Sequence, residues 1–127
     1  MKGKLKILSL RAKDAIMITV SDEILAEMVQ TIVREVDPER IYLFGSRARG
    51  NERADSDVDL LIVDRKPFGP GHSRFREINQ IYQALASFRV PKDIVLYASD
   101  EFAKWRTSIN HVVGRCNREG KLLYERS

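Results

Sequence analysis

The sequence has little of what marks secreted, disulfide-bonded or membrane proteins. Cys116 is the only cysteine among 127 residues, so no intramolecular disulfide can form. No apolar run approaches the ~20 residues that a membrane helix requires. The basic start of the chain is not followed by the continuous apolar stretch of a secretory signal. Together these absences predict a cytoplasmic protein without a membrane segment.

The first thirteen residues lack acidic side chains, although five of them are basic. The whole chain carries a net charge of +4 and has a pI near 9.4. A basic end can contact nucleic acid or an acidic partner. However, no aromatic residues are interleaved with the basic ones to stack on bases. We therefore interpret residues 1–20 as a basic, solvated extension, and nucleic acid as the less favoured partner.

Apolar residues nevertheless make up 43% of the chain, enough for one domain with its own core over residues 1–127. Their spacing, together with capping and turn residues, predicts the secondary structure. In order, we expect a helix at 21–36 capped by Ser21 and ended by Asp37-Pro38, strands at 41–44 and 58–63, a helix bearing Ile78 to Phe88, a strand at 93–97, a last helix from Ser99 to Gly120, and an edge strand at 121–125. Residues 16–20 fit either a short strand or an apolar lead-in, and loops are expected at 50–56 and 64–73.

This order of elements predicts an α/β (α+β) fold in which helices flank a small mixed sheet. The short link between the first two strands favours an antiparallel pair, and a longer crossover leads to the third. The strand at 58–63 is almost continuously apolar, which suits burial on both faces.

The segment from Ile41 to Val63 carries the most chemistry. Asp57 and Asp59 stand two residues apart at a strand start, so their side chains share one face, with Cα atoms roughly 6.5–7 Å apart. Left alone, the two carboxylates would repel. A divalent cation removes that penalty, and Mg²⁺ prefers such oxygen ligands. Two such ions ~3.5–4 Å apart can hold the attacking and leaving oxygens of a displacement at phosphorus.

A Gly45-Ser46 pair precedes these carboxylates and suits a phosphate group. Gly45 has no side chain to block a close approach, and Ser46 offers a hydroxyl at the start of an expected helical turn with free amides. Arg47, Arg49 and Arg53 add positive charge. Alone, a Gly-Ser pair is most often a turn, and two spaced aspartates are most often a solvated strand end. Their combination in one segment favours a site for metal and phosphate.

These residues resemble a known family. Gly45-Ser46, ten intervening residues and Asp57-Val58-Asp59 are similar to the G-S-x10-D-x-D signature of the DNA polymerase β-like nucleotidyltransferase superfamily. The longer run Gly-Ser-Arg-Ala-Arg-Gly followed by Ser-Asp-Val-Asp-Leu resembles its small stand-alone branch, the minimal nucleotidyltransferases (MNT). The resemblance covers about residues 22–125, and its core motif is more specific than its flanks.

The resemblance implies a polymerase β-like nucleotidyltransferase fold that uses ATP and Mg²⁺, with two ions expected. It also implies a third acidic residue on a later strand, which Asp93 matches. By this resemblance, the catalytic and metal-binding residues are Asp57, Asp59 and Asp93, and the nucleotide-binding residues are Gly45, Ser46, Arg47 and Arg49. An incoming hydroxyl would attack the α-phosphorus, with Asp93 directing its proton, and pyrophosphate would leave.

The acceptor is expected outside the chain, because 127 residues leave no room for the additional domains of larger superfamily members. Minimal members resemble antitoxins paired with a helical HEPN toxin, and some transfer AMP to a tyrosine of that partner. The resemblance therefore implies an adenylyltransferase antitoxin. Three alternatives stay open: an antitoxin that neutralises its toxin by binding alone, a nucleotidyltransferase for a small-molecule acceptor, and a nucleic-acid binder whose affinity falls steeply with salt.

Other reactive or aromatic residues have simpler interpretations. His72, in the loop rich in proline and glycine, is expected to face solvent. His111 lies off the apolar stripe of the predicted last helix and is expected at the surface. Cys116 lies on that stripe and is interpreted as a core thiol. Trp105 is interpreted as a core or interface residue.

Overall fold

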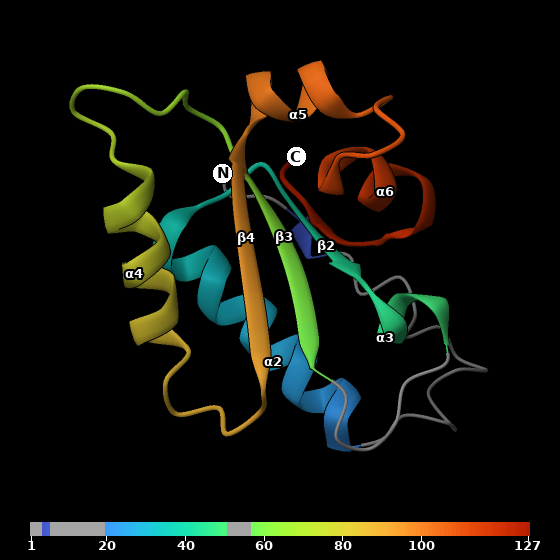
Figure 1. Cartoon of the computed structure of the whole chain (residues 1–127). Helices are drawn as coiled ribbons and strands as arrows, with labels where there is room; N and C mark the ends of the chain where they lie inside the picture. Colours follow the sequence, from blue (N-terminus) through green and yellow to red (C-terminus); the bar gives the residue numbers. More distant parts are fainter. Residues whose placement is uncertain (1–3, 6–19, 51–56) are drawn as a thin grey trace.

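The computed structural model describes residues 4–5, 20–50 and 57–127. Its elements are, in chain order, β1 (Lys4–Leu5), α2 (Val20–Val36), β2 (Arg40–Phe44), α3 (Ser46–Arg49), β3 (Val58–Asp64), α4 (Arg74–Ala84), β4 (Lys92–Ala98), α5 (Ser99–Trp105), α6 (Val112–Glu119) and β5 (Lys121–Glu125). Figure 1 shows this arrangement. The predicted α/β (α+β) fold with a mixed sheet is confirmed.

The strands form one sheet in the order β1-β5-β2-β3-β4. β2 and β3 are antiparallel, whereas β3 and β4 are parallel and joined through α4. Both pairings agree with the sequence prediction. The strand at 121–125 also forms, but it is not an edge strand: β5 lies between β2 and the two-residue β1. The basic sequence around Lys4–Leu5 contains no pattern that would predict a strand there.

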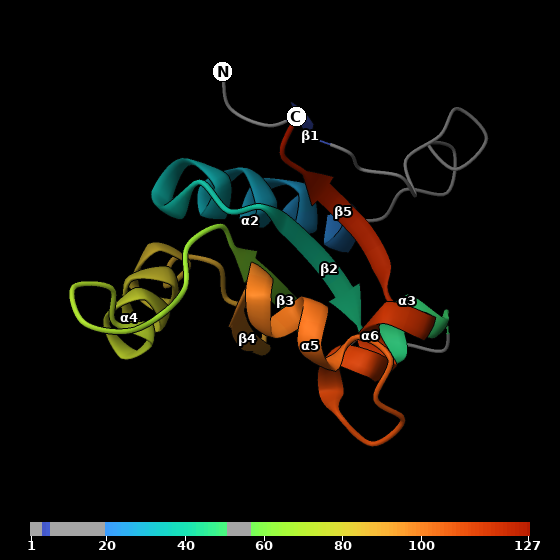
Figure 2. The same ribbon diagram turned by 90° about the horizontal axis from the view of Figure 1, so that it is seen from above.

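Helices cover both faces of this sheet. Figure 2 shows α2 and α4 on one face and α5 and α6 on the other. Alternate side chains of β3 enter the two layers, as a pleated strand requires. Leu60 and Ile62 belong to the large cluster beneath α2 and α4, whereas Leu61 and Val63 belong to a smaller cluster with Phe102 of α5.

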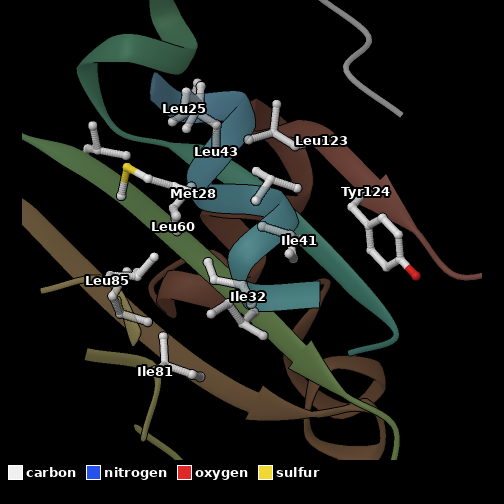
Figure 3. Close-up of a cluster of buried hydrophobic side chains, with 14 of the residues drawn as sticks. Leu25, Met28, Ile32, Ile41, Leu43, Leu60, Ile81, Leu85, Leu123 and Tyr124 are labelled. Carbon is white, nitrogen blue, oxygen red and sulfur yellow. The ribbon is translucent and has the colours of Figure 1, made fainter. Parts of the chain in front are cut away.

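The large cluster is the main core of the domain (Figure 3). Helix α2 contributes one apolar stripe, which includes Met28 and Ile32, and both side chains are fully buried. They pack with Ile41 of β2, Leu60 of β3 and Ile81 of α4. The predicted helical stripe is therefore confirmed. The helix ends at Val36, followed by Asp37 with a positive φ of 46°.

The predicted last helix is wrong, because the chain breaks it into α5 and α6. Ile109, which stands seven residues after Phe102 and so at helical spacing from it, lies between the two helices and is 77% exposed. His111 begins α6 as its N-cap and accepts a hydrogen bond from the backbone N–H of Val113. Gly114 packs so closely on the carbonyl of Ser108 that a Cβ would collide with it. This close packing holds α6 against the segment that leaves α5. The predicted stop at Gly120 is confirmed.

Several predictions concern residues outside the described part of the chain. These are the basic extension at 1–20 apart from Lys4–Leu5 and Val20, the strand or lead-in at 16–20, the loop over 51–56, and Arg53. Helix α2 begins at Val20, one residue before the predicted cap Ser21. Within the described residues, no helix is both long enough and apolar enough to cross a membrane.

Candidate active site at the start of β3 and β4

Asp59 and Asp93 lie side by side on neighbouring strands. They are direct partners in the parallel pairing of β3 with β4. Both side chains share the sheet face of Leu61 and Val95, because residues two apart on a strand point the same way. Asp59 is partly buried and Asp93 is exposed. The structure thus brings together two of the three carboxylates predicted to bind metal.

Asp57 immediately precedes β3 and is exposed. The next residue, Val58, is held by a backbone hydrogen bond of 2.8 Å from its N–H to the carbonyl of Pro91, just before β4. This bond fixes the entry of β3 against the entry of β4. Asp57 is close enough to Asp59 for its charge to raise the Asp59 pKa, so all three predicted carboxylates act on one region.

Gly45 is where the phosphate turn meets these carboxylates. It follows β2, whose last residue, Phe44, is the cross-strand partner of Asp59. Its backbone is left-handed, with φ 76°, and a Cβ at this position would collide with the Asp59 carboxylate. Only glycine fits both requirements without strain. The turn and the carboxylate are therefore packed directly against each other.

The four-residue helix α3 confirms the predicted helical turn after Gly45. Its first residue is Ser46, whose side chain lies outside the described part. Arg47 and Arg49 project from α3 and lower the pKa of Asp59 through their charge. Arg49 also lies 3.9 Å from Glu119 in an exposed ion pair. Contacts of Ser46 and the two arginines with a nucleotide stay a prediction.

The electrostatics of this site favour a cation. Burial raises the pKa of Asp59, and the charges of Asp93 and then Asp57 raise it further. Three carboxylates in such an arrangement repel one another unless positive charge lies between them. The candidate metal ligands are all carboxylate oxygens, and two of the three residues are exposed. Such a site suits Mg²⁺, which keeps some of its bound water. The residues therefore fit the cation that was predicted.

A second cluster of candidate ligands lies at the opposite end of β3. It comprises Asp64, His72 and Glu77. The expectation of a solvated His72 is wrong, because its ring contacts both carboxylates. Burial raises the pKa of Glu77 to about 7, and the neighbouring Asp64 carboxylate adds to the effect. The sequence missed this cluster because its members belong to a strand, a loop and a helix without any regular spacing.

Cys116, His111 and Trp105 lie in the α5/α6 layer. Cys116 is buried, as predicted, and burial raises its thiol pKa to about 12. The His111 ring stacks on Trp105 at 4.6 Å between ring centres and caps α6, so it is partly buried rather than a free surface residue. Trp105 packs against the smaller cluster. None of these side chains belongs to the carboxylate site.

A comparison with models of protein families shows to which family this chain is related. Residues 26–127 match the family described as "Polymerase beta, Nucleotidyltransferase". The chain belongs to this family. The match spans most of the nucleotidyltransferase and includes every predicted site residue from Gly45 to Asp93. Among the curated proteins compared with it, none matches significantly.

Solved structures give a likeness of fold. A candidate nucleotidyltransferase from Sulfolobus solfataricus is 24% identical with a TM-score of 0.50, covering 65% of this chain and 70% of that one. Two toxin–antitoxin structures each cover 78% of this chain and 72% of the other. One, with AMP-PNP, is 21% identical at a TM-score of 0.49, and the other, a mutant of MntA–HpeT, is 17% identical at 0.46. The first likeness supports the nucleotidyltransferase fold alone.

Proposed function

We propose that this nucleotidyltransferase transfers AMP from ATP to a hydroxyl group of another protein, in a reaction that depends on Mg²⁺. The observation that carries the proposal is the in-register pair Asp59 and Asp93, placed beside the Gly45 turn and under the charge of Asp57. In a family of nucleotidyltransferases, carboxylates gathered beside a side-chain-free turn suit a triphosphate with its cation.

Each residue has a distinct part in the proposed reaction. Asp57, Asp59 and Asp93 would hold Mg²⁺, which when bound offsets the negative charge of the phosphate oxygens. Gly45 leaves its backbone open to the phosphates, and the charges of Arg47 and Arg49 attract them. Asp93 would also direct the proton of the attacking hydroxyl, and pyrophosphate would leave. Catalysis then depends on positioning and charge rather than on a covalent intermediate.

An acceptor from outside the chain suits the openness of the site. Asp57 and Asp93 are both exposed, so a large acceptor can approach the carboxylates directly. The resemblance of Gly45 to Asp59 to the minimal nucleotidyltransferases supports a specific acceptor, a tyrosine hydroxyl of a HEPN toxin. In that role the chain acts as the antitoxin, and modification inactivates the toxin.

The test is a transfer assay with the intact protein, α-labelled ATP, Mg²⁺ and the product of the adjacent gene. We expect label on the partner, because an α-label remains with the AMP group. The Asp57→Asn variant should lose the label. Asp100→Asn is the matched control, because Asp100 is exposed in the first turn of α5 and lies outside the site. It should label the partner as the unchanged protein does.

Two results would contradict the proposal. A tight complex with the partner and no label in either protein would mean that the chain neutralises by binding alone. Label on the partner that persists in both Asp57→Asn and Asp59→Asn would place the chemistry elsewhere. Mass spectrometry of the labelled partner identifies the modified residue, and a site other than tyrosine would refute the specific acceptor.

A further inference from the structure

Asp64, His72 and Glu77 converge from three elements at the end of β3 that is remote from Asp59. Asp64 ends the strand, His72 lies in the following loop, and Glu77 is in the first turn of α4. One ligand atom from each residue lies within 4.8 Å of the others. The Asp64 side chain is only 8% exposed and that of Glu77 only 13%. This cluster is therefore largely enclosed by protein.

The His72 ring is held so that one particular nitrogen faces the carboxylates. Its Nδ1 lies 2.8 Å from the carbonyl of Pro67, and a carbonyl can only accept a hydrogen bond. Nδ1 therefore carries a proton. Nε2 faces Asp64 and Glu77, so it donates a proton to them in the charged ring and turns its lone pair toward them in the neutral ring, the form that binds a metal. Phe68 stacks on the ring at 4.6 Å and fixes its plane. Metal-binding histidines are commonly oriented by such a backbone contact on the other nitrogen.

Two of the three ligand–ligand distances are close to the edges of a metal coordination shell. His72 Nε2 lies 3.4 Å from Asp64 Oδ2 and 3.0 Å from Glu77 Oε1. Ligands bound to zinc at about 2.0–2.2 Å in a tetrahedron lie about 3.3–3.6 Å apart. The ligand atoms of Asp64 and Glu77 lie within 4.8 Å of each other, so adjustment of these side chains would bring the three atoms to bonding distance of one ion. Three protein ligands leave a fourth position for water.

Glu77 provides a second, independent indication. Its Oε2 is fully buried and accepts no hydrogen bond from a described N–H or O–H donor, and its closest acidic neighbour is the Asp64 carboxylate. An unpaired buried carboxylate oxygen is costly, and the nearby Asp64 carboxylate adds repulsion. Asp64 Oδ1 accepts a hydrogen bond from the backbone N–H of Lys66, so that residue is already oriented by its own loop. Two carboxylates that converge on one imidazole nitrogen call for a positive charge between them, which either a proton on Nε2 or a metal ion supplies.

We propose that Asp64, His72 and Glu77 form a binding site for one divalent transition-metal ion of the zinc class. An imidazole nitrogen combined with two carboxylate oxygens suits Zn²⁺, whereas Mg²⁺ prefers oxygen ligands alone. The ion would join the end of β3, the crossover loop and the start of α4. Asp64 and Asp59 are about 16 Å apart along β3 and face opposite sides of the sheet, so this ion would lie too far from Asp59 to take part in its chemistry. Its role is therefore to stabilise the crossover.

The test is metal binding by the intact protein after removal of divalent ions, with Zn²⁺ alone as the probe and Mg²⁺ for comparison. We expect one equivalent of Zn²⁺ to bind and to raise the melting temperature, and Mg²⁺ at the same concentration to do neither at this site. Co²⁺ in place of Zn²⁺ should give the visible absorption of a tetrahedral site. All measurements are repeated in the Asp59→Asn protein, where the Zn²⁺ effect should persist.

His72→Asn should weaken Zn²⁺ binding by about 100-fold or more, since even groups that only orient a ligand contribute about 10- to 100-fold. His111→Asn is the matched control, because an asparagine can still cap α6, and it should bind Zn²⁺ as before. Glu77→Gln is a second variant of nearly unchanged shape that should also lose binding. Circular dichroism of each metal-free variant confirms that it is folded.

Three results would overturn the proposal. One is the absence of any Zn²⁺ effect on the melting temperature, in which case a proton rather than a metal fills the cluster. Another is Zn²⁺ binding that survives both His72→Asn and Glu77→Gln. The last is a Zn²⁺ effect that disappears in Asp59→Asn, which would assign the ion to the other end of β3. None of these results depends on whether the chain transfers AMP.

Discussion

The two ends of β3 both present carboxylates, but they differ in exposure, donor type and support. Asp59 shares its region with two exposed carboxylates and a glycine turn, on the α5/α6 face. Asp64 is buried on the α2/α4 face, beside an imidazole whose orientation a backbone carbonyl fixes. An exposed set of oxygens allows a cation to enter and leave with a substrate. An enclosed set with nitrogen suits an ion that stays.

The comparison is tested most severely by removing the central carboxylate of the exposed end. Asp59→Asn should lower the rate of nucleotidyl transfer by about 100- to 1,000-fold, the usual effect of losing one group that stabilises charge in the transition state. Single-turnover assays with saturating ATP measure the loss. Asp100→Asn serves again as the control of equal charge change. A loss of less than about 10-fold would contradict the assignment of Asp59 to the reaction site.

On the same face of the sheet as Asp59, the side chains beneath α5 and α6 are buried, so solvent should not reach them. Cys116 reports on this, because burial raises its pKa to about 12 and little thiolate exists near neutral pH. We expect alkylation at pH 8 to be about 100-fold slower in the folded protein than in denaturant. Cys116→Ser controls for reaction at other side chains. Labelling at the denatured rate would show that this layer is open.

Substitution of Gly45 tests how tightly the turn after β2 packs against the Asp59 carboxylate. Gly45→Ala introduces both left-handed backbone strain and a collision with the Asp59 carboxylate, so the free energy of unfolding should fall by about 2–4 kcal/mol. Gly50 has nearly the same φ, 77°, but a Cβ there would meet no atom of the described residues within 4 Å. Gly50→Ala should therefore cost about 1–2 kcal/mol from strain alone. Equal losses in urea denaturation would refute the close packing at Gly45.

The smallest expected effect concerns charge repulsion at the exposed end. In metal-free protein, Asp59→Asn should raise the melting temperature by about 1–4 °C, because it removes a partly buried carboxylate that Asp93 and Asp57 repel. Saturating Mg²⁺ should reduce this difference by stabilising the unchanged protein. Differential scanning calorimetry at neutral pH measures both values. A lower melting temperature for the metal-free variant would mean that Asp59 supports the fold through contacts that outweigh the repulsion.

The exposed end could be predicted from the sequence because its parts are local. Gly45 and Asp59 belong to one segment, joined as an antiparallel pair, and Asp93 opens the next strand. The remote end could not be predicted, since His72 reaches Asp64 only after the loop folds back through Phe68 and Pro67. The spacing of residues along the sequence does not specify how this loop folds back onto β3.

The break between α5 and α6 was missed for a related reason. Ile109 continues a helical spacing from Phe102, and spacing alone cannot show where a chain turns away. Two short-range contacts mark the break, and neither follows from the apolar spacing: the cap that His111 provides and the fit of Gly114 against Ser108. The position of β5 inside the sheet likewise depends on β1, a pairing across almost the whole length of the chain.

The pairing of Asp59 with Asp93 has a consequence for protein synthesis. The motif around Gly45 and Asp57 leaves the ribosome well before β4, with the entire crossover through α4 in between. A nascent chain that has not yet reached Lys92 lacks Asp93 and the strand that aligns it with Asp59. Nucleotidyl transfer should therefore appear only after β4 has paired with β3. A chain that is still being translated up to that point would neither modify an acceptor nor consume a nucleotide.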